Sequence, residues 1–199
     1  ASATRPSPHG FAGDRGAPSG AYGGGMAEAP VHVVLLGLMG AGKSSIGQRV
    51  AERLGRPLLD GDEVLEARTG GRTAADVAEE EGLDALHALE AQVAIGLLAT
   101  PDPAVIGPAA SVVEVAAARE ALLPHVVVWL RASAGHHAAK AAEKPHRPLP
   151  GGTDLLALFE AQLAARGPRL EALAELVVDI ESGTRDEHAD AIADYVMRR

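Results

Sequence analysis

One short motif constrains the fold of this chain more than any other feature. Residues 37–44 read Gly-Leu-Met-Gly-Ala-Gly-Lys-Ser and match the pattern G-x-x-x-x-G-K-[ST] in full. The motif follows an apolar, β-branched run at residues 31–36 and opens a segment with helical spacing at residues 43–54. Backbone N–H groups of such a loop, together with the N-terminus of the helix, bind phosphate oxygens. The sequence therefore predicts a phosphate-binding loop (P-loop) that joins a buried parallel strand to a helix.

The residue types in the loop fit a nucleoside triphosphate with Mg²⁺. In P-loop proteins the lysine bridges the β- and γ-phosphates and the hydroxyl residue binds the metal ion, roles that fall here on Lys43 and Ser44. A dinucleotide-binding loop is disfavoured, because the spacing G-x-G-x-x-G is absent from residues 37–44. The expected nucleotide contacts in this segment are Gly37, Gly40, Ala41, Gly42, Lys43, Ser44 and Ser45.

Beyond the loop, strand-like and helix-like segments alternate along the chain. This alternation predicts a three-layer α/β/α fold with a doubly wound, mostly parallel sheet. Further strands are expected at residues 58–59, 104–106, 126–130 and 176–180, and helices at 63–67, 74–81, 84–98, 111–122, 154–165, about 168–175 and from about 186. Residues 140–153 are polar and carry three prolines, which predicts a mobile connection.

Composition limits the classes of function. The charge sum of the 199 residues is 18 − 27 = −9, which disfavours nucleic acid and anionic membranes as partners. The absence of cysteine excludes disulfides and zinc–thiolate sites, and no apolar run approaches the ~20 residues that span a bilayer. Residues 1–25 form a Gly/Ala/Pro-rich stretch that we expect to be a disordered leader, with one domain over residues 26–199. We expect a cytoplasmic monomer that acts on a small molecule.

Two carboxylates follow the second expected strand, in the run Leu59-Asp60-Gly61-Asp62. Ligands of doubly wound sheets bind beyond the carboxyl ends of the strands, which places both aspartates at the predicted site. One carboxylate would hold Mg²⁺ and the other would orient or deprotonate an acceptor hydroxyl. The alternative is that Asp62 only caps the following helix.

With these motifs in place, the sequence resembles the shikimate kinases, small P-loop kinases, from about residue 31 to residue 196, nearly the whole expected domain. The resemblance implies a five-stranded parallel sheet and a lid, here at about residues 140–153, that closes over the site. The matching segments are the P-loop at 37–44, the Asp-x-Asp segment at 59–66 with Arg-Thr-Gly at 68–70, residues 82–90, the lid motif Arg-Pro-Leu at 147–149, Arg-Gly-Pro at 166–168 and the last strand at 176–179.

The resemblance implies the following roles at the nucleotide. Lys43 and Ser44 fall on the phosphate and Mg²⁺ positions, and Asp60 on the outer-sphere Mg²⁺ position. Arg147 falls on the lid arginine that reaches the phosphates and, with Lys43 and Asp62, would act in catalysis. Lys140 falls where the family has an arginine that stacks on adenine.

The acceptor side departs from the family. Of two arginines that bind the substrate carboxylate, one is matched by Arg166, whereas the other falls on His87. An imidazole cannot provide a permanently charged, bidentate fork. The family's triple glycine is replaced by Gly107-Pro108-Ala109, and Pro108 has no N–H group to donate. The expected acceptor contacts are Asp62, His87, Glu90, Gly107, Arg166 and, as a partial replacement for the missing cation, Arg169.

The expected function is ATP- and Mg²⁺-dependent phosphorylation of a hydroxyl group on a small acceptor, with shikimate as the first candidate. Two alternatives remain open, a kinase of another cyclitol or sugar acid and a non-catalytic nucleotide-binding relative. The pair His136-His137 lacks a third ligand at a useful spacing, so we expect a solvated pair rather than a metal site.

Overall fold

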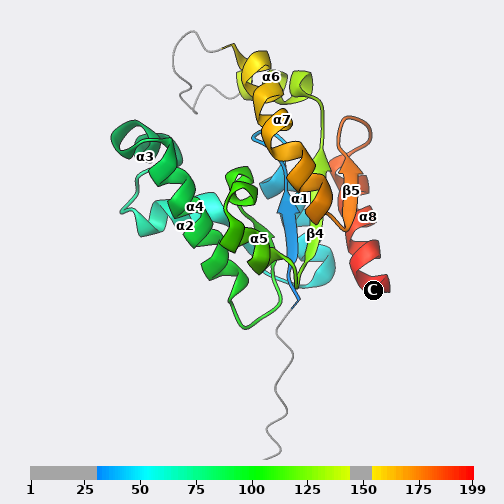
Figure 1. The fold of residues 1–199 in the computed structure, drawn as a ribbon. Helices are drawn as coiled ribbons and strands as arrows, with labels where there is room; N and C mark the ends of the chain where they lie inside the picture. The colour runs from blue at the N-terminus through cyan, green and yellow to red at the C-terminus, as the bar shows by residue number, and fades with distance from the viewer. Residues whose placement is uncertain (1–30, 144–153) are drawn as a thin grey trace, which may run out of the picture.

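The computed structural model describes residues 31–143 and 154–199, and these form one five-stranded sheet between two layers of helices (Figure 1). All strands are parallel, in the order β2-β3-β1-β4-β5. The strands are β1 (Val33–Leu36), β2 (Leu58–Asp60), β3 (Val105–Gly107), β4 (Val126–Arg131) and β5 (Leu176–Asp179). The predicted α/β class and the five-stranded parallel sheet are confirmed.

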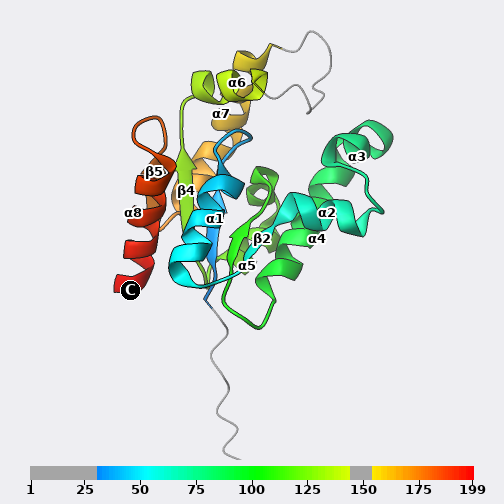
Figure 2. The same ribbon diagram turned by 180° about the vertical axis from the view of Figure 1, so that it is seen from behind.

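The central strand β1 supplies both faces of the core. Val33 and Leu35 pack with α1 (Lys43–Leu54) and α8 (Arg185–Arg198), which Figure 2 shows on one side of the sheet. Val34 and Leu36 pack on the opposite side, mainly against α4 (Leu83–Leu98), α5 (Ala116–Leu122) and α7 (Leu155–Leu173). A continuously apolar strand is what burial on both faces requires.

The remaining elements complete the layer on the side of α4. They are α2 (Gly61–Arg68), α3 (Ala74–Glu81), the 3₁₀ helix η1 (Ala110–Glu114) and α6 (Ala134–Ala142). Helix α6 lies beyond the carboxyl end of β1, against the P-loop and one end of α7 (Figure 1). In the part of the chain that the structure describes, no helix is long and apolar enough to cross a membrane.

Three sequence-based expectations about helices were wrong. Helix α6 was not predicted, because its apolar face consists only of small alanines, Ala134, Ala138 and Ala141, which give a weak signal. Ser133 caps the helix by accepting a hydrogen bond from the His136 N–H group. The break expected before Pro168 is absent, and α7 continues through this proline. Pro168 has no N–H group to donate to the Ala164 carbonyl. Both residues lie on the exposed side of the helix, where water can hydrate that carbonyl. The helix expected over residues 111–122 is instead two pieces that meet at Val115.

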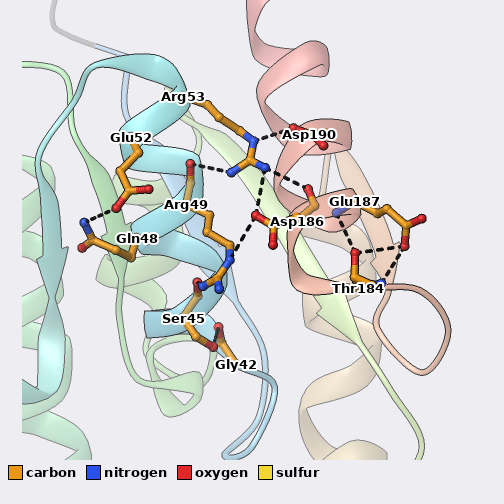
Figure 3. Close-up of polar contacts among 10 residues, drawn as sticks. All are labelled: Gly42, Ser45, Gln48, Arg49, Glu52, Arg53, Thr184, Asp186, Glu187 and Asp190. Carbon is orange, nitrogen blue, oxygen red and sulfur yellow. Dashed lines mark hydrogen bonds and ion pairs between the residues drawn. The ribbon is translucent and has the colours of Figure 1, made fainter.

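A polar network holds α8 against α1 (Figure 3). Arg53 pairs with Asp190 and Asp186, and Arg49 Nε lies 3.2 Å from Asp186 Oδ1. The Arg53 hydrogen bond is the main cause that holds the pKa of Asp186 below its ordinary value. Thr184 and Glu187 form a capping box at the start of α8. Because these charges are exposed, the network orients α8 while the apolar contacts beneath it supply most of the stability.

Leu36 is fully buried beside the P-loop, so Leu36→Ala is expected to lower the free energy of unfolding by about 2–5 kcal/mol. The matched control is Leu123→Ala, which removes the same atoms from a side chain that is 70% exposed and is expected to change stability by less than about 0.5 kcal/mol. Urea unfolding followed by circular dichroism measures both. Equal losses for the two variants would contradict the assignment of β1 as the centre of the core.

Candidate active site

The P-loop connects β1 to α1 at the carboxyl edge of the sheet. Gly40 and Gly42 adopt left-handed backbone conformations, with φ of 85° and 78°, which glycine adopts at no steric cost. The Lys43 ammonium group donates to the Gly37 carbonyl at 2.8 Å, and the Ser45 hydroxyl donates to the Gly42 carbonyl at 3.2 Å. Lys43 is thus folded back along the loop, in the position from which an ammonium reaches bound phosphate oxygens.

Asp60 ends β2 and links the P-loop to the next helix. Its Oδ2 atom accepts from the Ser44 hydroxyl at 2.6 Å, and its Oδ1 atom accepts from the Asp62 N–H group at 3.0 Å. Asp60 is therefore the N-cap of α2, and the alternative that Asp62 only caps this helix is wrong. The side chain of Asp62 instead lines a narrow cleft.

The donor set at Ser44 and Asp60 suits Mg²⁺. Mg²⁺ keeps most of its water and is bound by one or two protein oxygens together with substrate phosphates. A serine hydroxyl and a carboxylate oxygen 2.6 Å apart, directly after the P-loop, match that preference. Residues 31–143 and 154–199 contain no group of three or more His, Cys, Asp or Glu side chains that would form an all-protein metal cage.

The cleft beside Asp62 lies where the acceptor was expected. Gly61, Asp62, Glu90, Val93, Pro108 and Ala109 line it. Burial raises the pKa of Glu90 above its ordinary value, while a hydrogen bond from the Ser111 hydroxyl acts in the opposite direction. Pro108 is buried and follows Gly107 at the end of β3, so the proline that breaks the glycine run does face this site.

Arg166 and His87 both contact the carboxylate of Glu114, a residue that the sequence motifs did not indicate. Arg166 Nε and Nη2 donate to the two Glu114 carboxylate oxygens at 3.2 and 3.3 Å. His87 Nδ1 lies 3.5 Å from Glu114 Oε2. Glu114 is in η1, outside every motif, and only the folding of α4, η1 and α7 together reveals the contact.

Helix α6 rests directly on the P-loop. A Cβ atom at Gly40 would lie 2.9 Å from the Lys140 Cβ atom, so the close approach of α6 requires glycine there. His137 is buried, stacks at a tilt on Phe159, and its Nδ1 atom lies 3.0 Å from the Met39 carbonyl oxygen. The expectation of a solvated His136-His137 pair is therefore wrong for His137, because helix α6, which was not predicted, directs the His137 side chain toward the core.

Three expected site residues remain, Lys140, Arg169 and Arg147. Lys140 lies beside the loop, where its ammonium group pairs with Glu143 at 3.0 Å. Arg169 is exposed and donates to the Ala165 carbonyl of its own helix at 2.8 Å, away from the Arg166–Glu114 pair. Arg147 and the rest of the expected lid from residue 144, like the expected leader at 1–25, lie outside the described residues.

A parallel sheet with a P-loop after its central strand, and two carboxylates that follow the edge strand β2, defines the class of P-loop kinases of small molecules. The family model for shikimate kinase matches residues 39–197. The chain belongs to the shikimate kinase family and is an ATP-dependent kinase.

Individual relatives agree over most of the chain. A shikimate kinase of Mycobacterium tuberculosis is 34% identical over 166 residues, which cover 83% of this chain and 91% of the relative. One of Symbiobacterium thermophilum is 39% identical over 141 residues, 69% of this chain and 80% of the relative. The structure of shikimate kinase from Acinetobacter baumannii in complex with shikimate superposes with a TM-score of 0.76 at 26% identity, covering 86% of this chain and 95% of that one.

The buried His137 predicts a loss of stability in mild acid. Burial lowers the pKa of its imidazole from 6.5 to about 4, so between these pH values the unfolded chain binds more protons than the folded one. The free energy of unfolding is therefore expected to fall as the pH drops from about 6.5 to about 4. His137→Leu is expected to reduce this fall, measured by urea unfolding at pH 7 and pH 4.5.

Part of the acid sensitivity will remain in that variant, because burial also lowers the pKa of His32 and of His125. Retention of the complete wild-type difference between pH 7 and pH 4.5 would contradict the assignment to His137.

Proposed function

We propose that this chain transfers the γ-phosphoryl group of Mg²⁺-ATP to a hydroxyl group of a small polyhydroxylated acceptor, with shikimate as the first candidate. The observation that carries the proposal is the junction at Asp60: one carboxylate contacts Ser44 of the P-loop and the backbone of Asp62 at the acceptor cleft. Donor and acceptor ends of a transfer reaction are thereby held side by side.

Each residue has a distinct task in this proposal. Lys43 holds the β- and γ-phosphates, and Asp62 accepts a hydrogen bond or the proton from the acceptor hydroxyl as it attacks. Ser44 and Asp60 would hold Mg²⁺, which supplies charge neutralisation at the phosphates. By resemblance alone, Arg147 reaches the transferring group and Lys140 lies near adenine. Cytoplasmic location and a monomeric state remain sequence-based predictions.

A kinase of a different cyclitol or sugar acid is the second candidate. It is favoured by two features of the acceptor cleft, the buried Pro108 without an N–H group and the imidazole of His87 in place of an arginine. The non-catalytic alternative is less supported, since Lys43, Ser44 and Asp60 are all present, Lys43 lies along the P-loop and Ser44 donates to Asp60.

The proposal predicts ADP release from Mg²⁺-ATP that depends on shikimate and on Lys43. Lys43→Ala is expected to lower kcat/KM by about 10²–10³-fold, because it removes a positive charge aimed at the transferring phosphoryl group. A coupled ADP assay with and without shikimate measures the rate. The control is Arg198→Ala, which also removes one positive charge, but from a side chain that is 77% exposed at the end of α8, and it is expected to leave the rate near wild type.

Three outcomes are informative. ATP binding without a response to shikimate would move the proposal to the second candidate and to a screen of cyclitols and sugar acids. Equal rates for wild type and Lys43→Ala would contradict phosphoryl transfer at this loop. Loss of ATP binding in the wild-type chain would contradict the nucleotide site itself.

A further inference from the structure

In the part of the chain that the structure describes, the acceptor end of the site holds more acidic than basic side chains. Asp62 and Glu90 line the acceptor cleft, and His87 lies three residues before Glu90 on the same helix, α4. Glu114 joins them through its contacts with Arg166 and His87. Among the described residues of this group, Arg166 is the permanent cation, against the carboxyl side chains of Asp62, Glu90 and Glu114.

That cation is already paired. Its Nε and Nη2 atoms donate to both oxygens of Glu114, the bidentate geometry that arginine also uses for a ligand carboxylate. The Arg166 side chain is only 12% exposed, whereas Glu114 is 30% exposed. The pair thus carries no net charge, and Glu114 forms its outer half.

The surface beside the pair supports the same conclusion. A groove of about 590 Å³ runs between α4 and the η1–α5 segment. Among the described residues that line it, Glu114 and His87 are present and Arg166 is not. At this surface the pair therefore presents the carboxylate of Glu114, with the imidazole of His87 beside it, rather than the guanidinium.

We propose that Glu114 is a specificity-determining residue, which occupies Arg166 in place of an acceptor carboxylate and so turns the acceptor site toward uncharged polyols. This inference rests on the proposed function. An anionic acceptor has either to displace Glu114 from the Nε–Nη2 edge of Arg166 or to bind the remaining guanidinium N–H groups beside the Glu114 carboxylate. Both the lost pairing and the repulsion between like charges raise its KM. An uncharged polyol binds without this competition.

The test compares shikimate with its methyl ester, which keeps the ring hydroxyls and lacks the charge. For the wild-type chain, kcat/KM for the ester is expected to equal or exceed that for the acid. Glu114→Gln keeps the shape and one acceptor oxygen but removes the charge. It is expected to lower KM for shikimate by about tenfold or more, with kcat and the values for the ester changed less than about threefold.

A matched control is Glu120→Gln on α5, which makes the same change of charge at an exposed position and is expected to leave the acid-to-ester ratio as in the wild type. Glu114→Ala is measured alongside, and thermal unfolding checks that each variant is folded. A wild-type preference for shikimate of tenfold or more, unchanged by Glu114→Gln, would overturn the inference while leaving the proposed function intact.

If neither acceptor is phosphorylated, the result counts against the proposed function. The role of Glu114 is then tested by measuring the affinity for shikimate. Calorimetric titration of shikimate into the wild type and Glu114→Gln, each with ATP, gives that answer. Tighter binding to the variant by about tenfold or more supports the role of Glu114. Equal affinities, or equal absence of binding, overturn it.

Discussion

The carboxylate of Asp60 is the interaction on which the arrangement of this site depends. One of its oxygens accepts from Ser44 at the start of α1, and the other accepts from the Asp62 backbone at the start of α2. Two helix N-termini are thereby fixed to the end of one strand, and both point toward the same edge of the sheet. In the proposed reaction this one side chain would bring together a phosphate bound at the first helix and a hydroxyl group beside the second.

The parts of the fold that could be predicted are those with a local signal. The P-loop and the apolar run of β1 each occupy a few consecutive positions, where spacing and residue type determine the backbone. Helix α6 could not be predicted in this way, since its stability comes from His137 on Phe159 and on the Met39 carbonyl, contacts with segments far along the chain in both directions. The local signal is weak, since the apolar face of α6 carries only the small side chains of Ala134, Ala138 and Ala141.

The same division holds at the site. Sequence motifs indicated the phosphate end residue by residue, and Lys43, Ser44 and Asp60 lie together as that pattern requires. At the acceptor end the motifs indicated Arg166 and His87 but not the anion between them. Glu114 belongs to a 3₁₀ turn that replaced an expected helix, so neither its position nor the direction of its side chain followed from spacing.

A phosphate-binding loop and an acceptor site tolerate change differently, for a physical reason. In a phosphate-binding loop, backbone N–H groups make most of the contacts with phosphate oxygens. Phosphate binding is therefore retained wherever the glycines and the lysine keep the same loop conformation. Acceptor recognition depends on side-chain charge, and a largely buried guanidinium without a partner is costly to keep. Among the described residues at the acceptor end, position 87 carries an imidazole and Arg166 is the permanent cation, which Glu114 stabilises. In our proposal this internal pairing sets the charge preference of the acceptor site.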